Sequence, residues 1–246
     1  MSFLSVVGRA KISILSRRWK GFCASCPVFD FHPNNFLRKG GFDLNYNNFD
    51  YLIEFKGIHK RIKKFMKFID ASSDQFCEAK LCIQEFRLLV GVLDVEKSFR
   101  RVDRWIGLVL ENGVKELDLE VITDGSKVYS FPKAIFSAKS ATTLKPSGCK
   151  LEQPSNIIRF NSLKHLTLVR VYINEQLVQR LTSECPLRED LLLSLCTGLK
   201  RLCVSKADKL KIIKVKTFQN LYWKVLKLMF QVFKSKFFLS LGQLLD

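Results

Sequence analysis

The chain of 246 residues is long enough to bury a substantial hydrophobic core without disulfides or metals. Hydrophobic residues make up 47% and charged residues 26%, which excludes an intrinsically disordered chain. The 41 Lys and Arg residues leave a net charge of +18 against 23 Asp and Glu residues, but this charge is spread along the chain and by itself indicates only non-specific attraction to polyanions.

The first segment, MSFLSVVGRAKISILSRRWK, does not read as a secretion signal, because Arg9 and Lys11 interrupt the apolar stretch that such a signal requires. The eight cysteines are therefore expected to be free thiols in the reducing nucleus or cytoplasm. Cys23, Cys26 and His32 have metal-like spacing, but no second pair of ligands completes a zinc site. We interpret these cysteines as small apolar residues, and expect neither a metal nor a cofactor.

Two different segments follow before residue 81. Residues 27–50 hold Pro, Gly and Asn clusters and are predicted to be a loop-rich connector. Residues 55–69 have the apolar period of a helix, with lysines on the remaining faces. The apolar side could dock on the following domain, or the helix could lie on a membrane surface or a phosphate backbone. We favour docking, with the lysines in solvent.

An internal repeat begins near residue 83. Segments of the form apolar-x-x-apolar-x-apolar recur as IQEFRL, VKELDL, ATTLKP, LKHLTL, REDLLL, LKRLCV and LKIIKV. Between the middle apolar positions the steps are 31, 27, 22, 25 and 22 residues, with the LKRLCV copy inside the last step. Most of these steps lie in or near the period of roughly 20–29 residues of a leucine-rich repeat. The middle apolar residues are Phe86, Leu117, Leu144, Leu166, Leu191 and Ile213.

The segments between these copies have helical features. Asn174 is predicted to cap a helix that ends before Pro186. Residues 98–113 show a helical apolar period closed by Gly113. We therefore predict an α/β fold, a leucine-rich-repeat solenoid over residues 81–217 in which short parallel strands alternate with helices. Leu117, Leu166 and Leu193 should be buried in its strands.

Two residues depart from the repeat pattern and two support it. Pro146 replaces an inward apolar residue and lacks the N–H of a strand ladder. Arg188 places a charge in a core position. Cys149 and Cys196 each follow a middle leucine by five residues, which is the Asn/Cys position of the repeat, so both are predicted to pack in the core.

The chain after Thr217 loses the repeat. Its apolar residues have helical spacing, so residues 218–246 are predicted to be a helical tail or cap. Four lysines interrupt the stretch between Trp223 and Gly242, so it is not expected to span a membrane.

No catalytic pattern is present in the sequence: there is no Ser–His–Asp order, nucleophile elbow or phosphate-binding loop. We expect a binding protein and not an enzyme. A partner would contact the outward residues of the strands, which alternate with the buried ones. His165 is one of them, either as a ligand contact or simply as a solvated residue. The candidate partner-binding residues are Glu116, Asp118, His165, Thr167, Lys200 and Lys211.

The N-terminal segment and the repeats together resemble the plant F-box/LRR-repeat protein family. Residues 15–19 match the Leu-Ser-Arg-Arg-Trp signature of the second half of an F-box. Residues 102–121, 131–151 and 183–205 resemble the family's repeats. The family's first F-box helix, with its Leu-Pro start, has no counterpart, so the resemblance implies an N-terminally truncated F-box in a small helical remnant over residues 1–26.

What the resemblance implies is a substrate receptor of an SCF-type (cullin-RING) ubiquitin ligase, which binds a Skp-type adaptor and presents an unknown target protein. Adaptor binding is expected to be impaired without the first helix. An alternative is a basic solenoid that binds nucleic acid or another anionic surface, and a third is a solenoid without a ligase link. The residues expected to bind the adaptor are Leu4, Leu15, Arg18 and Trp19.

Overall fold

The computed structural model divides the chain into two compact units, one of residues 1–114 and 118–128 and the other of residues 115–117 and 129–246. The partial F-box expected over residues 1–26 lies outside the residues that the structure describes. Those described are residues 28–33, 56–78, 83–92, 95–123, 127–152, 154, 158–185, 187–199, 201–204, 209–216, 227–230 and 236–238.

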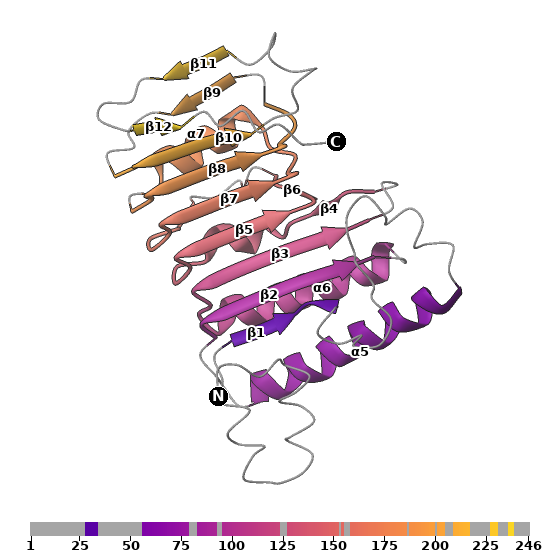
Figure 1. Ribbon diagram of the computed structural model, residues 1–246. Helices are drawn as coiled ribbons and strands as arrows, with labels where there is room; N and C mark the ends of the chain where they lie inside the picture. Colours follow the sequence, from indigo (N-terminus) through magenta and orange to yellow (C-terminus); the bar gives the residue numbers. More distant parts are fainter. Residues whose placement is uncertain are drawn as a thin grey trace. The chain divides into compact units, whose positions relative to one another are not determined.

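In the first unit, strands and helices alternate along the chain (Figure 1). The strand order is β1-β2-β3, and β1 runs parallel to β2 with Phe29 opposite Phe86. The elements are β1 (Val28–Phe31), α5 (Lys56–Glu78), β2 (Glu85–Gly91), α6 (Val95–Glu111) and β3 (Glu116–Ile122), whose residues from Asp118 belong to this unit.

Strand β1 lies within the segment that was predicted to be a loop-rich connector. Phe29 and Phe31 alternate with half-buried residues and are each only 1% exposed. The Phe31 ring lies 5.6 Å from Phe86 on β2 and 6.1 Å from Phe68 on α5. Four residues of alternation are too few to identify a strand from sequence, and the pairing with β2 decides the conformation.

Helix α5 confirms the predicted amphipathic helix and extends it to Glu78. On its apolar side Phe65, Met66 and Ile69 are buried, whereas Lys63 and Lys67 are exposed. The apolar side is therefore occupied by packing within this unit, which agrees with the docking interpretation.

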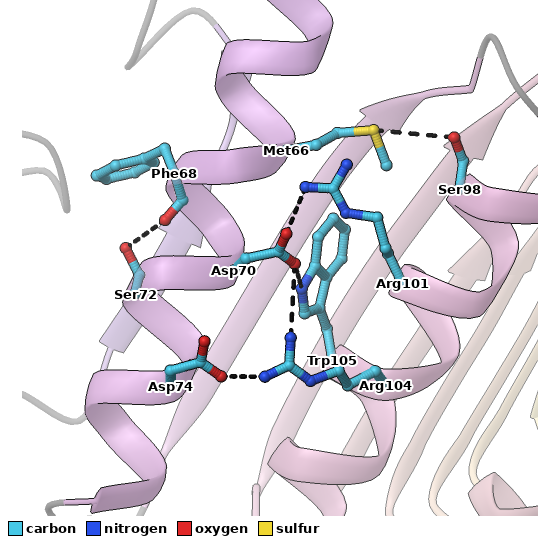
Figure 2. Close-up of polar contacts among 9 residues, drawn as sticks. All are labelled: Met66, Phe68, Asp70, Ser72, Asp74, Ser98, Arg101, Arg104 and Trp105. Carbon is cyan, nitrogen blue, oxygen red and sulfur yellow. Dashed lines mark hydrogen bonds and ion pairs between the residues drawn. The ribbon is translucent and has the colours of Figure 1, made fainter.

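A polar cluster joins α5 to α6 beside that apolar contact (Figure 2). Trp105 Nε1 on α6 donates a hydrogen bond to Asp70 Oδ1 at 2.9 Å. The same carboxylate accepts from Arg101, whose guanidinium lies 5.8 Å from the centre of the Trp105 ring. One turn farther along α5, Asp74 pairs with Arg104. Because Trp105 is fully buried, its N–H requires such a partner.

Helix α6 confirms the helix predicted over residues 98–113. Val102, Trp105 and Ile106 on its inner side are all 0% exposed. The helix ends at Glu111, and Gly113 follows with φ 68°, while its N–H donates to the carbonyl of Leu110. A residue with a Cβ would be strained in this left-handed conformation, so glycine ends the helix as predicted.

In the second unit, the strands β5, β7, β8, β10 and β12 lie side by side in this order (Figure 1). The pairs β4 with β6 and β9 with β11 form two small separate sheets. The elements are β4 (Tyr129–Ser130), η2 (Lys133–Ser137), β5 (Thr143–Ser147), β6 (Cys149–Lys150), β7 (His165–Val169), α7 (Glu175–Ser183), β8 (Asp190–Ser194), β9 (Arg201–Val204), β10 (Ile212–Lys216), β11 (Lys227–Phe230) and β12 (Lys236–Phe238).

The register of these parallel strands confirms the spacing read from the sequence. Leu144 on β5 lies opposite Leu166 on β7, which lies opposite Leu191 on β8 and then Ile213 on β10. All four side chains are buried. The steps of 22, 25 and 22 residues are therefore the lengths of successive repeats. Leu117, Leu166 and Leu193 are buried in strands as predicted.

Each of three strands is followed by a residue in the left-handed conformation. Gly148, Arg170 and Leu195 have φ 65°, 51° and 55° after β5, β7 and β8. Their N–H groups donate to the last carbonyl of the next strand, at 3.1, 2.8 and 2.8 Å. Cys149 and Cys196 come directly afterwards. Cys149 is buried as predicted, whereas Cys196 is only half-buried. Burial raises the pKa of the Cys149 thiol, and partial loss of solvent is the main cause that raises the pKa of Cys196 to about 11. Both thiols are therefore protonated near neutral pH.

Helix α7 confirms the cap predicted from sequence. Asn174 Oδ1 accepts a hydrogen bond from the N–H of Leu177 at 2.8 Å. At the other end, Glu184 Oε1 lies 2.7 Å from Arg180 Nε, and Glu184 Oε2 accepts from the N–H of Ile158 at 3.0 Å. The end of the helix is thereby tied to the segment that precedes β7.

Arg188 does occupy a buried position, as its place in the repeat predicted. Its side chain is only 2% exposed, and Nη1 donates to the carbonyl of Leu181 in the last turn of α7. A cation at a helix C-terminus interacts favourably with the helix dipole. Burial lowers the pKa of this guanidinium to about 10. Nη1 thus caps the helix, whereas Nε and Nη2 of Arg188 are buried without a hydrogen-bond partner among the described residues.

Pro146 is likewise buried, at the inward position of β5. The ladder between β5 and β7 pairs Thr143 with His165 and Ser147 with Val169 on either side of it. The strand therefore tolerates the missing N–H at one point.

The LKRLCV copy does not join the repeat strands. It forms β9, which pairs with β11 in a separate sheet, while Ile213 on β10 lies opposite Leu191 on β8. This explains why the copy falls within a single 22-residue step. The expectation that this copy belongs to the same sheet as the other strands is therefore wrong for β9. Lys200 lies outside the described residues, so its role as a partner-binding residue stays a prediction.

The helix expected over residues 218–246 is wrong for the residues described there, since residues 227–230 and 236–238 form β11 and β12. Short apolar runs have no period that separates helix from strand. Here β9 and β10 supply parallel partners for the two segments, and strand pairing prevails.

Candidate protein-interaction surface

The outward side of the repeat strands in the second unit is a continuous surface, here called the strand face. Its positions alternate with the buried leucines along each strand. The register places Thr167, Leu192 and Lys214 in one row across β7, β8 and β10. The outward residues are Lys145, His165, Thr167, Val169, Asp190, Leu192, Ser194, Ile212, Lys214 and Lys216.

An ion-paired row precedes the strands at one border of the strand face. Glu189 Oε1 lies 3.8 Å from Lys164 Nζ, and its Oε2 lies 2.5 Å from Lys211 Nζ. The hydrogen bond from Lys211 is the main cause that lowers the pKa of Glu189, and the same bond raises the pKa of Lys211. All three side chains reach solvent, so these ion pairs contribute little to the free energy of unfolding. Their main effect is on the charge at this border of the strand face.

His165 and Asp190 form a second pair in the adjacent row. His165 Nδ1 lies 2.7 Å from Asp190 Oδ2, and the two side chains are 45% and 38% exposed. His165 is thus on the outward face as predicted, and Asp190 holds its ring in one orientation. The other ring nitrogen is the one left to meet a partner.

The structure places the predicted partner-binding residues unevenly. His165 and Thr167 lie on β7 in the strand face, and Lys211 lies one position before β10. Ile212, not Lys211, is therefore the equivalent of His165, since both pair with Asp190. On β3, Glu116 is exposed and Asp118 is half-buried. The predicted residues that lie outside the described ones are Leu4, Leu15, Arg18, Trp19 and Lys200.

Sequence reasoning missed several outward residues of the strand face, among them Lys145, Asp190 and Leu192. They belong to the two repeat copies that carry Pro146 and Arg188 in place of inward apolar residues. The alternation of inward and outward positions would have located them, because the steps to neighbouring copies are regular.

Other kinds of site are not found in the part of the chain that the structure describes. No group of three or more His, Cys, Asp or Glu side chains there could hold a metal ion. Among the same residues, no helix combines the length and apolar composition that a membrane crossing requires. What this geometry offers is a surface for binding, formed by parallel strands.

A family model described as "At1g61320/AtMIF1, LRR domain" matches residues 79–243, more than half of the chain. The chain belongs to this leucine-rich-repeat family. The match includes β2 and extends past residue 217, where the sequence pattern of this leucine-rich-repeat protein fades.

Several curated relatives of this leucine-rich-repeat protein come from Arabidopsis thaliana. The F-box/FBD/LRR-repeat protein At1g78750 is 27% identical over 83% of the chain and 42% of its own length. The F-box/LRR-repeat protein At3g58900 is 28% identical, over 78% of the chain and 53% of its length. The putative F-box protein At3g58860 is 29% identical, over 87% of the chain and 43% of its own length. The chain thus spans about half of the length of these relatives. No solved structure matches it.

Proposed function

We propose that this leucine-rich-repeat protein is a protein-interaction scaffold that acts as a substrate receptor of an SCF-type (cullin-RING) ubiquitin ligase. The observation that carries the proposal is the alignment of F-box/LRR-repeat proteins over 78–87% of the chain. The regular strand face supports it, because parallel strands in fixed register hold outward side chains in a rigid array. Its contribution is binding and positioning, and the ubiquitin-transfer chemistry belongs to other subunits.

The two binding roles fall on different residues in this proposal. Leu4, Leu15, Arg18 and Trp19 contact the Skp-type adaptor. The target protein contacts the outward strand residues, with His165 and Thr167 among them. The protein acts in the nucleus or the cytoplasm, where its thiols stay reduced.

The adaptor half of the proposal is tested by calorimetry with a purified Skp-type adaptor. The 246-residue chain is compared with a version preceded by the first F-box helix of an F-box/LRR relative. We expect the version with the added helix to bind at least about tenfold more tightly, since that helix enlarges the contact area and supports the short remnant. Trp19→Ala should weaken binding of both proteins, while Lys139→Ala, an exposed change in the second unit, should not. Absence of binding by both proteins would refute the ligase proposal.

A further inference from the structure

We propose that the strand face of the second unit binds a partner segment in which acidic side chains flank a single apolar anchor. This inference rests on the proposed function and deepens it, because it states the chemistry of the target. It is carried by three observations on the strand face: an apolar centre, lysines on either side of that centre, and acidic residues that are already paired.

The apolar centre is formed by Leu192 and Ile212. Leu192 lies on β8 between Thr167 on β7 and Lys214 on β10, and Ile212 is the outward residue of β10 one row away. Both side chains are only half-buried although they point away from the core. Apolar groups that are exposed at the centre of a polar face are where the binding energy of protein interfaces concentrates.

Lysines border this centre on two sides. Lys145 on β5 and Lys214 on β10 lie in one row, which continues to Phe238 on β12, and Lys216 is the next outward residue along β10. Their side chains form no ion pair or hydrogen bond with any described residue, whereas Lys164 and Lys211 are paired with Glu189. Three strand spacings separate Lys145 from Lys214, which is about 14 Å.

The acidic residues on this surface do not cancel those lysines. Glu189 is shared between two lysines, and Asp190 is paired with His165. His165 carries positive charge only when it is protonated, but the unpaired Lys145, Lys214 and Lys216 outnumber Asp190, so the net charge around Leu192 is positive. An extended peptide covers about 14 Å in four to five residues. A fitting segment therefore has acidic residues about that far apart, with an apolar side chain between them.

A nucleic acid would use the same lysines but not the apolar centre. Phosphate contacts depend on the number of lysines and weaken steeply with salt, and they draw nothing from a leucine. The half-buried Leu192 and Ile212 between the lysines favour a protein segment. Nucleic-acid binding is accordingly an outcome of the test that would count against the proposal.

The test selects peptides from a random phage-displayed library on the full chain and measures the dissociation constant of the most enriched one by fluorescence anisotropy. We expect enriched peptides to carry two or more acidic residues around one large apolar residue. The double variant Lys145→Glu/Lys214→Glu should weaken their binding at least about tenfold. The acidic side chains of the peptide would then face glutamates, which repel them, in place of lysines, which attract them. The matched control Lys133→Glu/Lys139→Glu makes the same change at exposed lysines outside the strand face and should alter it less than about twofold.

A third variant separates a peptide surface from a polyanion surface. Leu192→Ala should weaken the selected peptide but leave binding of a 20-nucleotide DNA unchanged. Circular dichroism melting of each variant verifies that it is folded. The proposal is overturned if no peptide is enriched or if the enriched peptides are neutral or basic. It is also overturned if the two double lysine variants weaken peptide binding equally. It is also overturned if the DNA displaces the peptide and Leu192→Ala has no effect. None of these measurements involves the adaptor. A failure of the peptide proposal therefore leaves the ligase proposal intact, and a failure of adaptor binding leaves the peptide proposal intact.

Discussion

Trp105 and Asp70 are 35 residues apart in sequence, yet the indole N–H of Trp105 donates to the Asp70 carboxylate at 2.9 Å (Figure 2). The indole ring is fully buried while Asp70 keeps some contact with solvent. Asp70 also accepts from Arg101 and lies 3.9 Å from Arg104 Nη1, so one carboxylate joins three side chains of α6 to α5. The hydrogen bond joins a buried N–H to a charged carboxylate that also accepts other hydrogen bonds. Such a contact stabilises a fold more than an exposed ion pair does.

Replacing Trp105 with Phe tests this link between α5 and α6. The variant keeps most of the apolar volume but removes the N–H, so we expect the free energy of unfolding to fall by about 1–3 kcal/mol. Asp74→Asn is the comparison, because it removes only the Arg104–Asp74 pair, which is about half exposed and should contribute less than about 1 kcal/mol. Urea denaturation measures both. Equal losses for the two variants would show that the indole hydrogen bond has no special weight.

Leu166 tests the repeat core. It is 1% exposed and lies between Leu144 and Leu191 in neighbouring strands. Leu166→Ala should lower the free energy of unfolding by about 2–5 kcal/mol through lost burial and a cavity. Thr167→Ala, the next residue on the outward side, should change it by less than about 0.5 kcal/mol. The prediction fails if the two variants melt at the same temperature.

Two glycines give opposite expectations for the same substitution. Gly198 has φ 88°, and a Cβ there would lie 2.7 Å from the backbone oxygen of Ile173, so Gly198→Ala should destabilise by about 2 kcal/mol or more. Gly107 lies inside α6, where a Cβ would meet nothing within 4 Å. Gly107→Ala should therefore stabilise by about 0.5–1 kcal/mol. Thermal unfolding of both variants decides the matter, and a shift in the same direction for both would contradict the account.

Glu184 makes stability depend on pH. The hydrogen bond from Arg180 is the main cause that lowers its pKa from 4.5, and the N–H of Ile158 acts in the same direction. A depressed carboxyl pKa means that the charged form stabilises the fold. This stabilisation is complete above pH 4.5 and is lost as the pH falls through the folded-state pKa.

Glu184→Gln isolates this charge, because the amide oxygen can still accept from Ile158. We expect the variant to be less stable by about 1 kcal/mol at neutral pH, reduced by the partial exposure of the pair. The difference from the wild type should disappear in strong acid. Chemical denaturation at both pH values measures it, with Glu116→Gln, an exposed residue without an ion pair among the described residues, as the control. A difference that stays constant with pH would exclude this role.

The net charge of +18 predicts weak binding to duplex DNA that depends on salt but not on base sequence. The logarithm of the affinity should fall with the logarithm of salt concentration at a slope of about −0.9 per phosphate neutralised, and binding should vanish near physiological salt. Anisotropy titrations over a salt series on two unrelated duplexes measure this. Tight, sequence-selective binding at physiological salt would instead favour a nucleic-acid function.

The amino-acid sequence alone determined the features that depend on local pattern. Steps of 22, 25 and 22 residues predicted which leucines meet across strands, because inward positions recur once per repeat. The N-cap at Asn174 and the helix end at Gly113 were predictable for the same reason, since each depends on a few neighbouring residues. Two residues of the strand face, His165 and Thr167, followed as well from the alternation within LKHLTL.

Only the tertiary structure decided which strand each segment joins. LKRLCV and LKIIKV have the same pattern, yet β9 pairs with β11 and β10 pairs with β8. Strands β1, β11 and β12 consist of short segments that could be loop, helix or strand until a partner edge supplies hydrogen bonds. The role of Arg188 also depended on α7, whose last turn presents the Leu181 carbonyl to its guanidinium. Backbone pairing and capping join residues distant in sequence, and a local pattern contains no information about which distant partner is available.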